Sequence, residues 1–323
     1  METTLPNSPD LMLHVRRTIN MRDNTLDDAQ LETRCPLDNG RHDCTPISTS
    51  FSTNQLDRLP LELLIEVLLQ LDIPSLTRFR SLNRCAMKLV NSIHQYTAII
   101  EHCSDIIRAI LSIQADAFDC STLYRTLCTS RCFTCSRFGN YLYLIDCRRV
   151  CYFCFTERAE YFPLTSREAS KFFIPNTKSK RIVKSSRKLL ELAKPPSILS
   201  LPGRYCDAWT RRGEVGLMRA RRLRLYDRRT VVQSLAGSGL PQLDNTYREP
   251  KRFMAIISAP VLLDAGQQVD HGFFCCGCED ETDEETKHFR IKYMTKDISE
   301  HIASYGQVEK EPGYSTFMHV TKD

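Results

Sequence analysis

The chain has 323 residues, a formal net charge of +5, and ordinary shares of hydrophobic (42%) and charged (26%) residues. This length and composition are typical of a soluble protein of about two domains. The sequence contains no apolar run long enough to span a bilayer, and the modest net charge gives no argument for a nucleic-acid partner. Residues 1–20 lack the pattern of a secretory signal, which predicts an intracellular protein, cytoplasmic or nuclear. In that environment the fifteen cysteines are expected to be reduced thiols rather than disulfides.

The first region, residues 1–52, is rich in Asn, Asp, Thr, Ser and Pro and shows no sustained period. Such a segment cannot bury enough apolar surface to offset the entropy of ordering, so it is predicted to be a disordered leader.

Residues 53–101 carry apolar side chains at helical spacing. Four of them recur every four residues, and two more leucines lie one position further on: Leu59, Leu63, Val67 and Leu71, then Leu64 and Leu68. Pro60 suits the first turn of a helix, where its missing N–H has no partner to lose. Three short helices are expected, and because they bury little surface of their own, another protein or the following domain is expected to cover them. A connecting helix is predicted over residues 102–127.

Two Cys-x-x-Cys pairs stand within residues 128–175, Cys132 with Cys135 and Cys151 with Cys154, separated by fifteen residues. This spacing is typical of a structural zinc site in which four thiolates close a tetrahedral shell. The aromatic run over residues 141–145 predicts a strand between the pairs, so a knuckle and hairpin module is expected. Cys128 and Cys147 are rival ligands, which we interpret as buried neighbours.

The remainder of the chain contains two further predicted regions. Thr165 and Glu168 form a capping box that predicts a short helix over residues 166–173. Residues 176–250, with dense basic charge, are predicted to be a helical or linker region.

Residues 251–323 are predicted to be a second cysteine-containing module. A probable buried strand covers residues 254–257. Cys275, Cys278 and His301 are candidate ligands of a second zinc ion, and a reduced cysteine-rich turn is the alternative. The fourth ligand is left open among three residues, His271, Cys276 and His288.

The segment from Leu59 to Arg84 resembles an F-box. It opens with Leu-Pro-x-Glu-Leu-Leu at residues 59–64, and the spacing from there to a second apolar helix also matches the F-box pattern. The cysteine cluster over residues 132–154 is similar to the cysteine-rich segment that follows the F-box in many filamentous-fungal F-box proteins. The whole chain is therefore expected to be an α+β protein, mainly helical.

The resemblance implies a non-enzymatic adaptor. F-box domains dock on the Skp-type linker subunit of SCF-type (cullin–RING) ubiquitin ligases, and the rest of such a chain captures a protein substrate. The docking positions carried over from the family pattern are Leu59, Pro60, Leu63, Leu64, Val67, Leu68, Leu76 and Phe79.

Other functions find less support in the sequence. The chain has none of the common phosphate-binding, dinucleotide-binding, serine-hydrolase or zinc-protease motifs, and no catalytic residue is predicted. The main alternative is a zinc-finger nucleic-acid-binding regulatory protein. In that interpretation the arginine-rich residues 211–229 contact phosphates, as do four arginines around the cysteine tetrad: Arg131, Arg137, Arg148 and Arg149.

Overall fold

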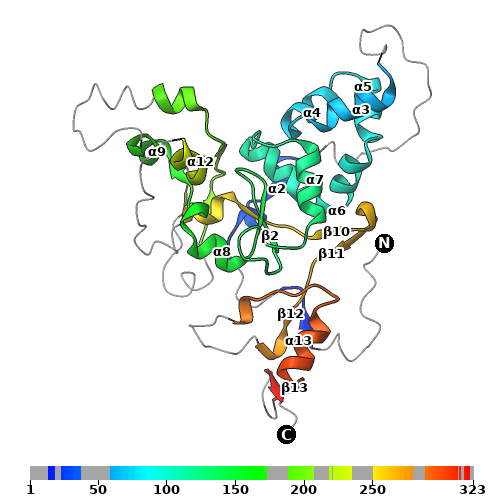
Figure 1. Ribbon diagram of the computed structural model, residues 1–323, viewed down its shortest axis with the longest axis vertical. Helices are drawn as coiled ribbons and strands as arrows, with labels where there is room; N and C mark the ends of the chain where they lie inside the picture. Colours follow the sequence, from blue (N-terminus) through cyan, green and yellow to red (C-terminus); the bar gives the residue numbers. More distant parts are fainter. Residues whose placement is uncertain are drawn as a thin grey trace.

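The computed structural model describes residues 14–18, 23–37, 59–172, 188–206, 218–219, 221–234, 250–278, 288–311, 313 and 316–320. Helices and short strands are mixed along this part of the chain (Figure 1). No helix within it combines the length and the apolar character that crossing a bilayer requires.

Helices dominate the first long described segment, in the order α3 (Leu61–Leu69), α4 (Ile73–Arg80), α5 (Arg84–Asn91), α6 (His94–Ile113) and α7 (Cys120–Cys128). Three of them begin at a side chain that accepts a hydrogen bond from the backbone N–H three residues on, over 2.8, 2.8 and 2.6 Å: Asp72, Asn83 and Asp119. Each cap satisfies a donor that the helix itself leaves open. These helix starts are therefore encoded locally.

The predicted boundary between residues 101 and 102 is not a boundary in the structure. Helix α6 passes through it and is only kinked at Cys103, whose φ and ψ are −136° and 34°. Ile99, Ile107 and Ile110 are fully buried on either side of the kink. One continuous apolar face therefore joins the two predicted regions.

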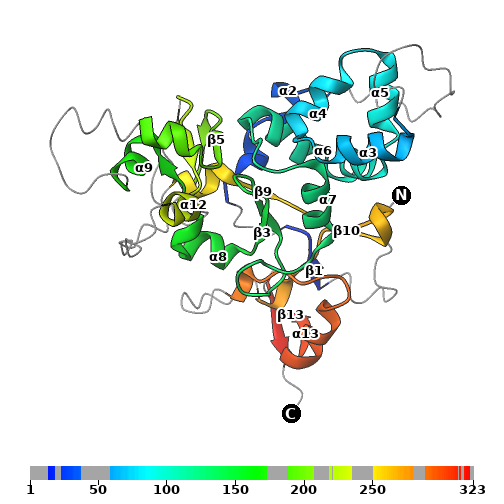
Figure 2. The same ribbon diagram turned by 45° about the horizontal axis from the view of Figure 1, so that its top comes forward.

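A three-stranded antiparallel sheet forms the centre of the molecule. Its order is β3-β2-β9, with β2 at Tyr141–Tyr143, β3 at Arg148–Val150 and β9 at Ile256–Ser258. Helices α6 and α7 lie on one side of it, and α8 (Tyr152–Glu157) and α12 (Arg228–Gln233) on the other (Figure 2). The strand predicted around residues 254–257, in the region predicted to be the C-terminal module, thus completes the sheet of the cysteine hairpin.

The predicted basic region contains strands as well as helix. A second sheet has the order β4-β8-β5, with β4 at Leu164–Thr165, β8 at Arg224–Tyr226 and β5 at Ser197–Leu199. Strands β6 (Gly203–Arg204) and β7 (Met218–Arg219) form a separate pair.

Helix α9 (Ser166–Phe172) begins where the capping box predicts. The backbone N–H of Thr165 donates to the Glu168 carboxylate over 2.8 Å, and the N–H of Glu168 donates back to the Thr165 hydroxyl over 3.3 Å. These reciprocal bonds satisfy two open donors at the helix start.

The predicted disordered leader is ordered where the structure describes it, at residues 14–18 and 23–37. Strand β1 (Val15–Arg16) pairs with β12 (Phe274–Cys275), and the short helices η1 (Leu26–Asp28) and α2 (Leu31–Arg34) pack on the central core. Leu26 is fully buried there. The rest of residues 1–52 lies outside the described part.

The C-terminal module packs around a small core of its own. Its elements are β12, η7 (Cys276–Cys278), η8 (His288–Arg290), α13 (Ile298–Tyr305), β13 (Gln307–Lys310) and β14 (Phe317–Val320). The strands β10 (Val261–Leu263) and β11 (Gln268–Asp270) and the short helix η6 (Asp264–Gly266) precede it in the chain, and they lie beside α6 and α7. Ile298, Ile302 and Val308 are buried within it. In Figure 1 this module lies at the opposite end of the molecule from α3, α4 and α5.

One buried arginine ties the pieces of the central core together. The guanidinium of Arg149 donates to backbone carbonyl oxygens at the end of α7, before β2 and after β9. These oxygens lie 2.6–3.2 Å away and belong to Thr126, Leu127, Gly139, Ala259 and Pro260. Only 2% of the residue is exposed, and burial lowers its pKa to about 10.

Replacing Arg149 by methionine is expected to lower the free energy of unfolding by about 3–5 kcal/mol, because several buried carbonyl oxygens lose their donors at once. Urea denaturation followed by circular dichroism measures this change. Arg125→Met, at an exposed arginine of α7, is the matched control and should change it by less than about 0.5 kcal/mol. Equal effects of the two substitutions would contradict the role given to Arg149.

Candidate metal centres and docking surface

The first cysteine tetrad is assembled at the base of the central hairpin. The four sulfur atoms of Cys132, Cys135, Cys151 and Cys154 all lie within 4.8 Å of one another. The Sγ atoms of Cys135 and Cys151 are 3.5 Å apart. A tetrahedral zinc ion with Zn–S bonds of about 2.3 Å places its sulfurs about 3.8 Å apart, so the arrangement fits that ion.

Local backbone structure positions both pairs. After Cys132 the chain turns back on itself, with the N–H of Ser136 donating to the Cys132 carbonyl over 3.1 Å and Ser136 in the left-handed region at φ 61°. Cys151 is the N-cap of α8, and Cys154 lies in the first turn of that helix. Strands β2 and β3 bring the turn and the helix start together. A turn, a hairpin and a helix start therefore supply the four sulfurs in chain order.

Hydrogen bonds between the thiols of the tetrad shift their pKa values in opposite directions. Hydrogen bonds from the Cys151 and Cys154 thiols hold the pKa of Cys132 far below its usual value, and those of Cys151 and Cys154 are raised by the same contacts. The lowered pKa of Cys132 favours the thiolate, which is the form that binds metal.

The two rival cysteines are not part of the tetrad. Cys147 is buried outside it, and burial raises the pKa of its thiol to about 12. Cys128 is exposed at the end of α7 rather than buried, so the prediction of a buried neighbour is wrong for this residue.

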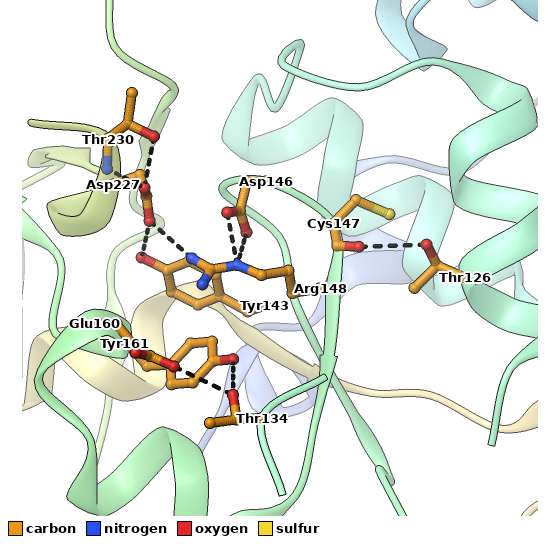
Figure 3. Close-up of polar contacts among 10 residues, drawn as sticks. All are labelled: Thr126, Thr134, Tyr143, Asp146, Cys147, Arg148, Glu160, Tyr161, Asp227 and Thr230. Carbon is orange, nitrogen blue, oxygen red and sulfur yellow. Dashed lines mark hydrogen bonds and ion pairs between the residues drawn. The ribbon is translucent and has the colours of Figure 1, made fainter. Parts of the chain in front are cut away.

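Two of the four arginines in the nucleic-acid interpretation are buried. Arg149 is bound to carbonyl oxygens as described above. Arg148, 6% exposed, forms ion pairs with Asp146 (2.6 Å) and Asp227 (3.0 Å), as Figure 3 shows. Asp227 also accepts from the N–H of Thr230 over 2.8 Å and so caps α12. These arginines join the hairpin to its neighbours and do not face a nucleic acid.

A second cluster forms in the C-terminal module, at the site that the sequence left incomplete. Its members are Cys275, Cys278, His301 and His319, whose ligand atoms also lie within 4.8 Å of one another. His319 Nε2 is 3.3 Å from the Cys275 sulfur and 3.2 Å from the Cys278 sulfur, and His301 Nε2 is 3.4 Å from the Cys278 sulfur. Two sulfurs and two imidazole nitrogens are a common zinc set.

The fourth member is His319, not one of the three residues considered from the sequence. Its Nδ1 lies 2.8 Å from the carbonyl oxygen of Gly306. A carbonyl oxygen only accepts, so Nδ1 carries the proton and Nε2 keeps the lone pair that a metal needs. Sequence spacing gave no signal for this residue, because the pairing of β14 with β13 brings it to the cluster.

His319→Ala is expected to lower the metal content of the purified chain from two ions to one, because three ligands hold zinc weakly and the first tetrad is untouched. Elemental mass spectrometry of the purified protein measures this content. The control is His271→Ala, a candidate from the sequence that lies outside the cluster, and it should retain both ions. Two ions in the His319 variant would rule out the second site as described.

The apolar stripe of α3 is divided between two environments. Leu64 and Leu68 are 9% and 2% exposed and pack into the core, as does Leu76 of α4, which is fully buried. Leu63 and Val67 point the other way and are 55% and 51% exposed. The three buried leucines therefore pack in the core of the free chain, and the docking role predicted for them stays a prediction.

The other predicted docking positions lie at or near the surface. Leu59 is 42% exposed, Pro60 is exposed, and Phe79 is partly buried against the core. Five of the eleven exposed large apolar side chains in the described part of the chain belong to this region: Leu59, Leu61, Leu63, Val67 and Leu82. We call these five residues the apolar face. Of the five, Leu59, Leu63 and Val67 recur every four residues and so follow one side of the start of α3.

His102 and Cys103 are adjacent on α6, at the kink of that helix. Burial raises the pKa of the Cys103 thiol to about 12, so the reactive thiolate is scarce at neutral pH.

Comparison with known proteins agrees with the helical part of this description. Residues 56–97 match the family model of the F-box domain, which spans α3, α4, α5 and the start of α6. F-box domains bind Skp-type linkers of SCF complexes, and F-box proteins in general are non-catalytic adaptors that bring substrates to the ubiquitin ligase. No curated protein and no solved structure matches the chain.

Proposed function

We propose that this protein is a substrate-recognition adaptor of an SCF-type ubiquitin ligase and acts in the cytoplasm or the nucleus. The observation that carries the proposal is the apolar face, which lies within the segment that matches the F-box model and is left exposed by this chain's own core. Burying a leucine or valine side chain stabilises an interface by about 1.5–3 kcal/mol. A few such residues offset the cost of association and give a stable complex.

In this function the two ends of the chain have different roles. The F-box helices bind the Skp-type linker. The region from the cysteine hairpin to the C-terminal module presents the substrate-binding surface, on a scaffold that the two metal clusters hold together.

Both clusters are proposed to hold structural zinc. Residues that would hold it are the four cysteines of the first tetrad and, in the second cluster, two cysteines and two histidines. With four protein ligands the tetrahedral shell is closed, so the ion would contribute folding free energy and would have no open position for substrate.

The test is complex formation between the purified full chain and a purified Skp-type linker. Isothermal titration calorimetry should give one-to-one binding with a negative heat-capacity change, which is the signature of apolar burial. A folded, metal-loaded chain that does not bind the linker would refute the adaptor function.

A further inference from the structure

The N-terminal segment of the chain is attached to the C-terminal module by one short strand pair. Strand β1 pairs with β12, and the partner of Val15 in this pair is Cys275. The N–H of Cys276 donates a hydrogen bond to the carbonyl oxygen of His14 over 2.9 Å. We call residues 14–17 the strap. Because Cys275 is a member of the second cluster, the strap pairs directly with a residue that would hold the metal.

The strap also contacts the strand that carries His319. The guanidinium of Arg16 lies 6.0 Å from the centre of the Phe317 ring, and the imidazole of His14 meets the same ring edge-on at 6.4 Å. Phe317 and His319 both belong to β14, and Phe317 packs against the small core of the module. A displacement of β14 would therefore remove contacts of the strap.

His301 is connected to the strap through one further layer of residues. The guanidinium of Arg17 lies 5.9 Å from the centre of the Phe273 ring. Phe273 and Tyr293 exchange two backbone hydrogen bonds, over 2.7 and 2.8 Å. The Tyr293 ring in turn stacks on the His301 imidazole, with the ring centres 4.3 Å apart. The strap thus rests on the same parts of the module that bring the ligand atoms of the second cluster together.

The apolar core that stabilises the module is small in the described part of the chain. Two of its buried residues are ligands of the second cluster, and one, Val15, belongs to the strap. A core of this size needs a further staple such as a metal ion, and metal binding supplies folding free energy in such modules. A strand pair of two residues is not stable without that support. The buried residues of this core are Val15, Phe273, Cys275, Cys276, Cys278, Ile298, Ile302 and Val308.

The next described segment of the leader, residues 23–37, is held by different contacts. Leu26 and Leu31 are buried in the central core. The carboxylate of Asp27 accepts a hydrogen bond from the N–H of Ser258 over 3.0 Å. None of these contacts involves a residue of the second cluster. Loss of the strap would therefore leave this segment in place, which makes it an internal reference.

We propose that the second cluster controls the attachment of the strap, an inference that rests on the metal proposed above for this cluster. In the metal-loaded chain, β12 and β14 hold residues 14–17 against the module. In the metal-free module these strands are no longer fixed, and the strap detaches. Coupling between two binding events is reciprocal, so the attached strap strengthens metal binding by the same factor, which is typically about 5–150-fold.

The first test is hydrogen–deuterium exchange of the purified, zinc-loaded full chain, followed by mass spectrometry. In His319→Ala, peptides covering the strap should exchange about tenfold faster than in the wild type, while peptides covering residues 26–34 should be unchanged. His319→Cys restores a fourth ligand, because three cysteines and one histidine are also a common zinc set, and it should keep the slow exchange of the strap.

Elemental mass spectrometry of each sample gives its metal content. Slow exchange of the strap in a His319→Ala chain that has lost the ion overturns the proposal. Fast exchange of the strap in a His319→Cys chain that holds both ions also overturns it, because the imidazole rather than the metal would then hold the strap.

The second test measures the reciprocal effect. Val15→Asp places a charge at a residue that is only 7% exposed, so it should detach the strap. Competition with a zinc chelator should then show about tenfold weaker binding of the second ion. Thr18→Asp adds the same charge at an exposed residue beyond the strap and is the matched control. Slow exchange of α13 in the zinc-saturated Val15 variant shows that the module is folded. Equal zinc affinity of the two variants overturns the coupling.

Metal content and linker binding are measured on the same preparations, so that the proposals fail separately. A wild-type chain that holds a single ion overturns the second site and this coupling together. A wild-type chain that holds two ions, with equal exchange of the strap in wild type and His319→Ala, contradicts the coupling alone. Linker binding tests the adaptor function independently of both results.

Discussion

Replacing Val67 by aspartate is expected to weaken binding of the Skp-type linker by about 100-fold or more while leaving the fold intact. Val67 is 51% exposed on the apolar face, so a charge is tolerated in the free chain. In the complex the same charge would be buried against apolar surface without a partner, which costs several kcal/mol. Titration calorimetry of wild type and variant measures the change.

Two further substitutions separate a docking role from a general effect. Leu192→Asp changes another exposed leucine, 80% exposed and outside the F-box match, and should leave linker binding unchanged. Leu68→Asp buries a charge in the core, since Leu68 is 2% exposed, and should lower the free energy of unfolding instead. Full linker binding by the Val67 variant would show that the apolar face is not the docking surface.

Cys154→Ser is expected to release one metal ion per chain and to lower the free energy of unfolding by several kcal/mol. Structural zinc contributes about 10–16 kcal/mol of folding free energy in isolated finger peptides, and a serine hydroxyl replaces a thiolate ligand poorly. The loss should extend beyond the hairpin, because β2 pairs with β9 and so joins the tetrad to the central core. Elemental mass spectrometry and urea denaturation measure the two effects.

Cys128→Ser is the matched control for this substitution, since Cys128 is an exposed cysteine close in sequence that lies outside the tetrad. It should keep both the metal content and the stability of the wild type. If the Cys154 variant retained the ion and its stability, the tetrad would not be a structural metal site.

The two metal clusters differ in how far the sequence could predict them. In the first, each Cys-x-x-Cys pair brings two sulfurs together within a few residues, and the second pair returns after a short hairpin, so spacing alone indicates the set. In the second, only Cys275 and Cys278 are close in sequence. His301 comes from α13 and His319 from β14, and the packing of these elements is what selects His319 over His271, Cys276 and His288.

The apolar stripe of α3 shows a similar limit. A period of four residues predicts a helix with a wide apolar side, and the family resemblance adds that part of this side binds a partner. The four-residue period does not determine which leucines face the core. The packing of α3 against its neighbours decides this, because it covers Leu64 and Leu68 and leaves Leu63 and Val67 exposed.

By itself the sequence determined the features that depend on residues a few positions apart: the F-box helices, the first cysteine tetrad and the capped start of α9. Such features depend only on local backbone geometry, which is either the repeat of three to four residues in a helix or the shape of a single turn. The tertiary structure alone decided the contacts between distant segments. It buried Arg148 and Arg149, joined β9 to the cysteine hairpin, ordered residues 23–37 against the core, and paired β1 with β12. Contacts of this kind leave no period in the sequence, because they depend on how all the segments pack at once.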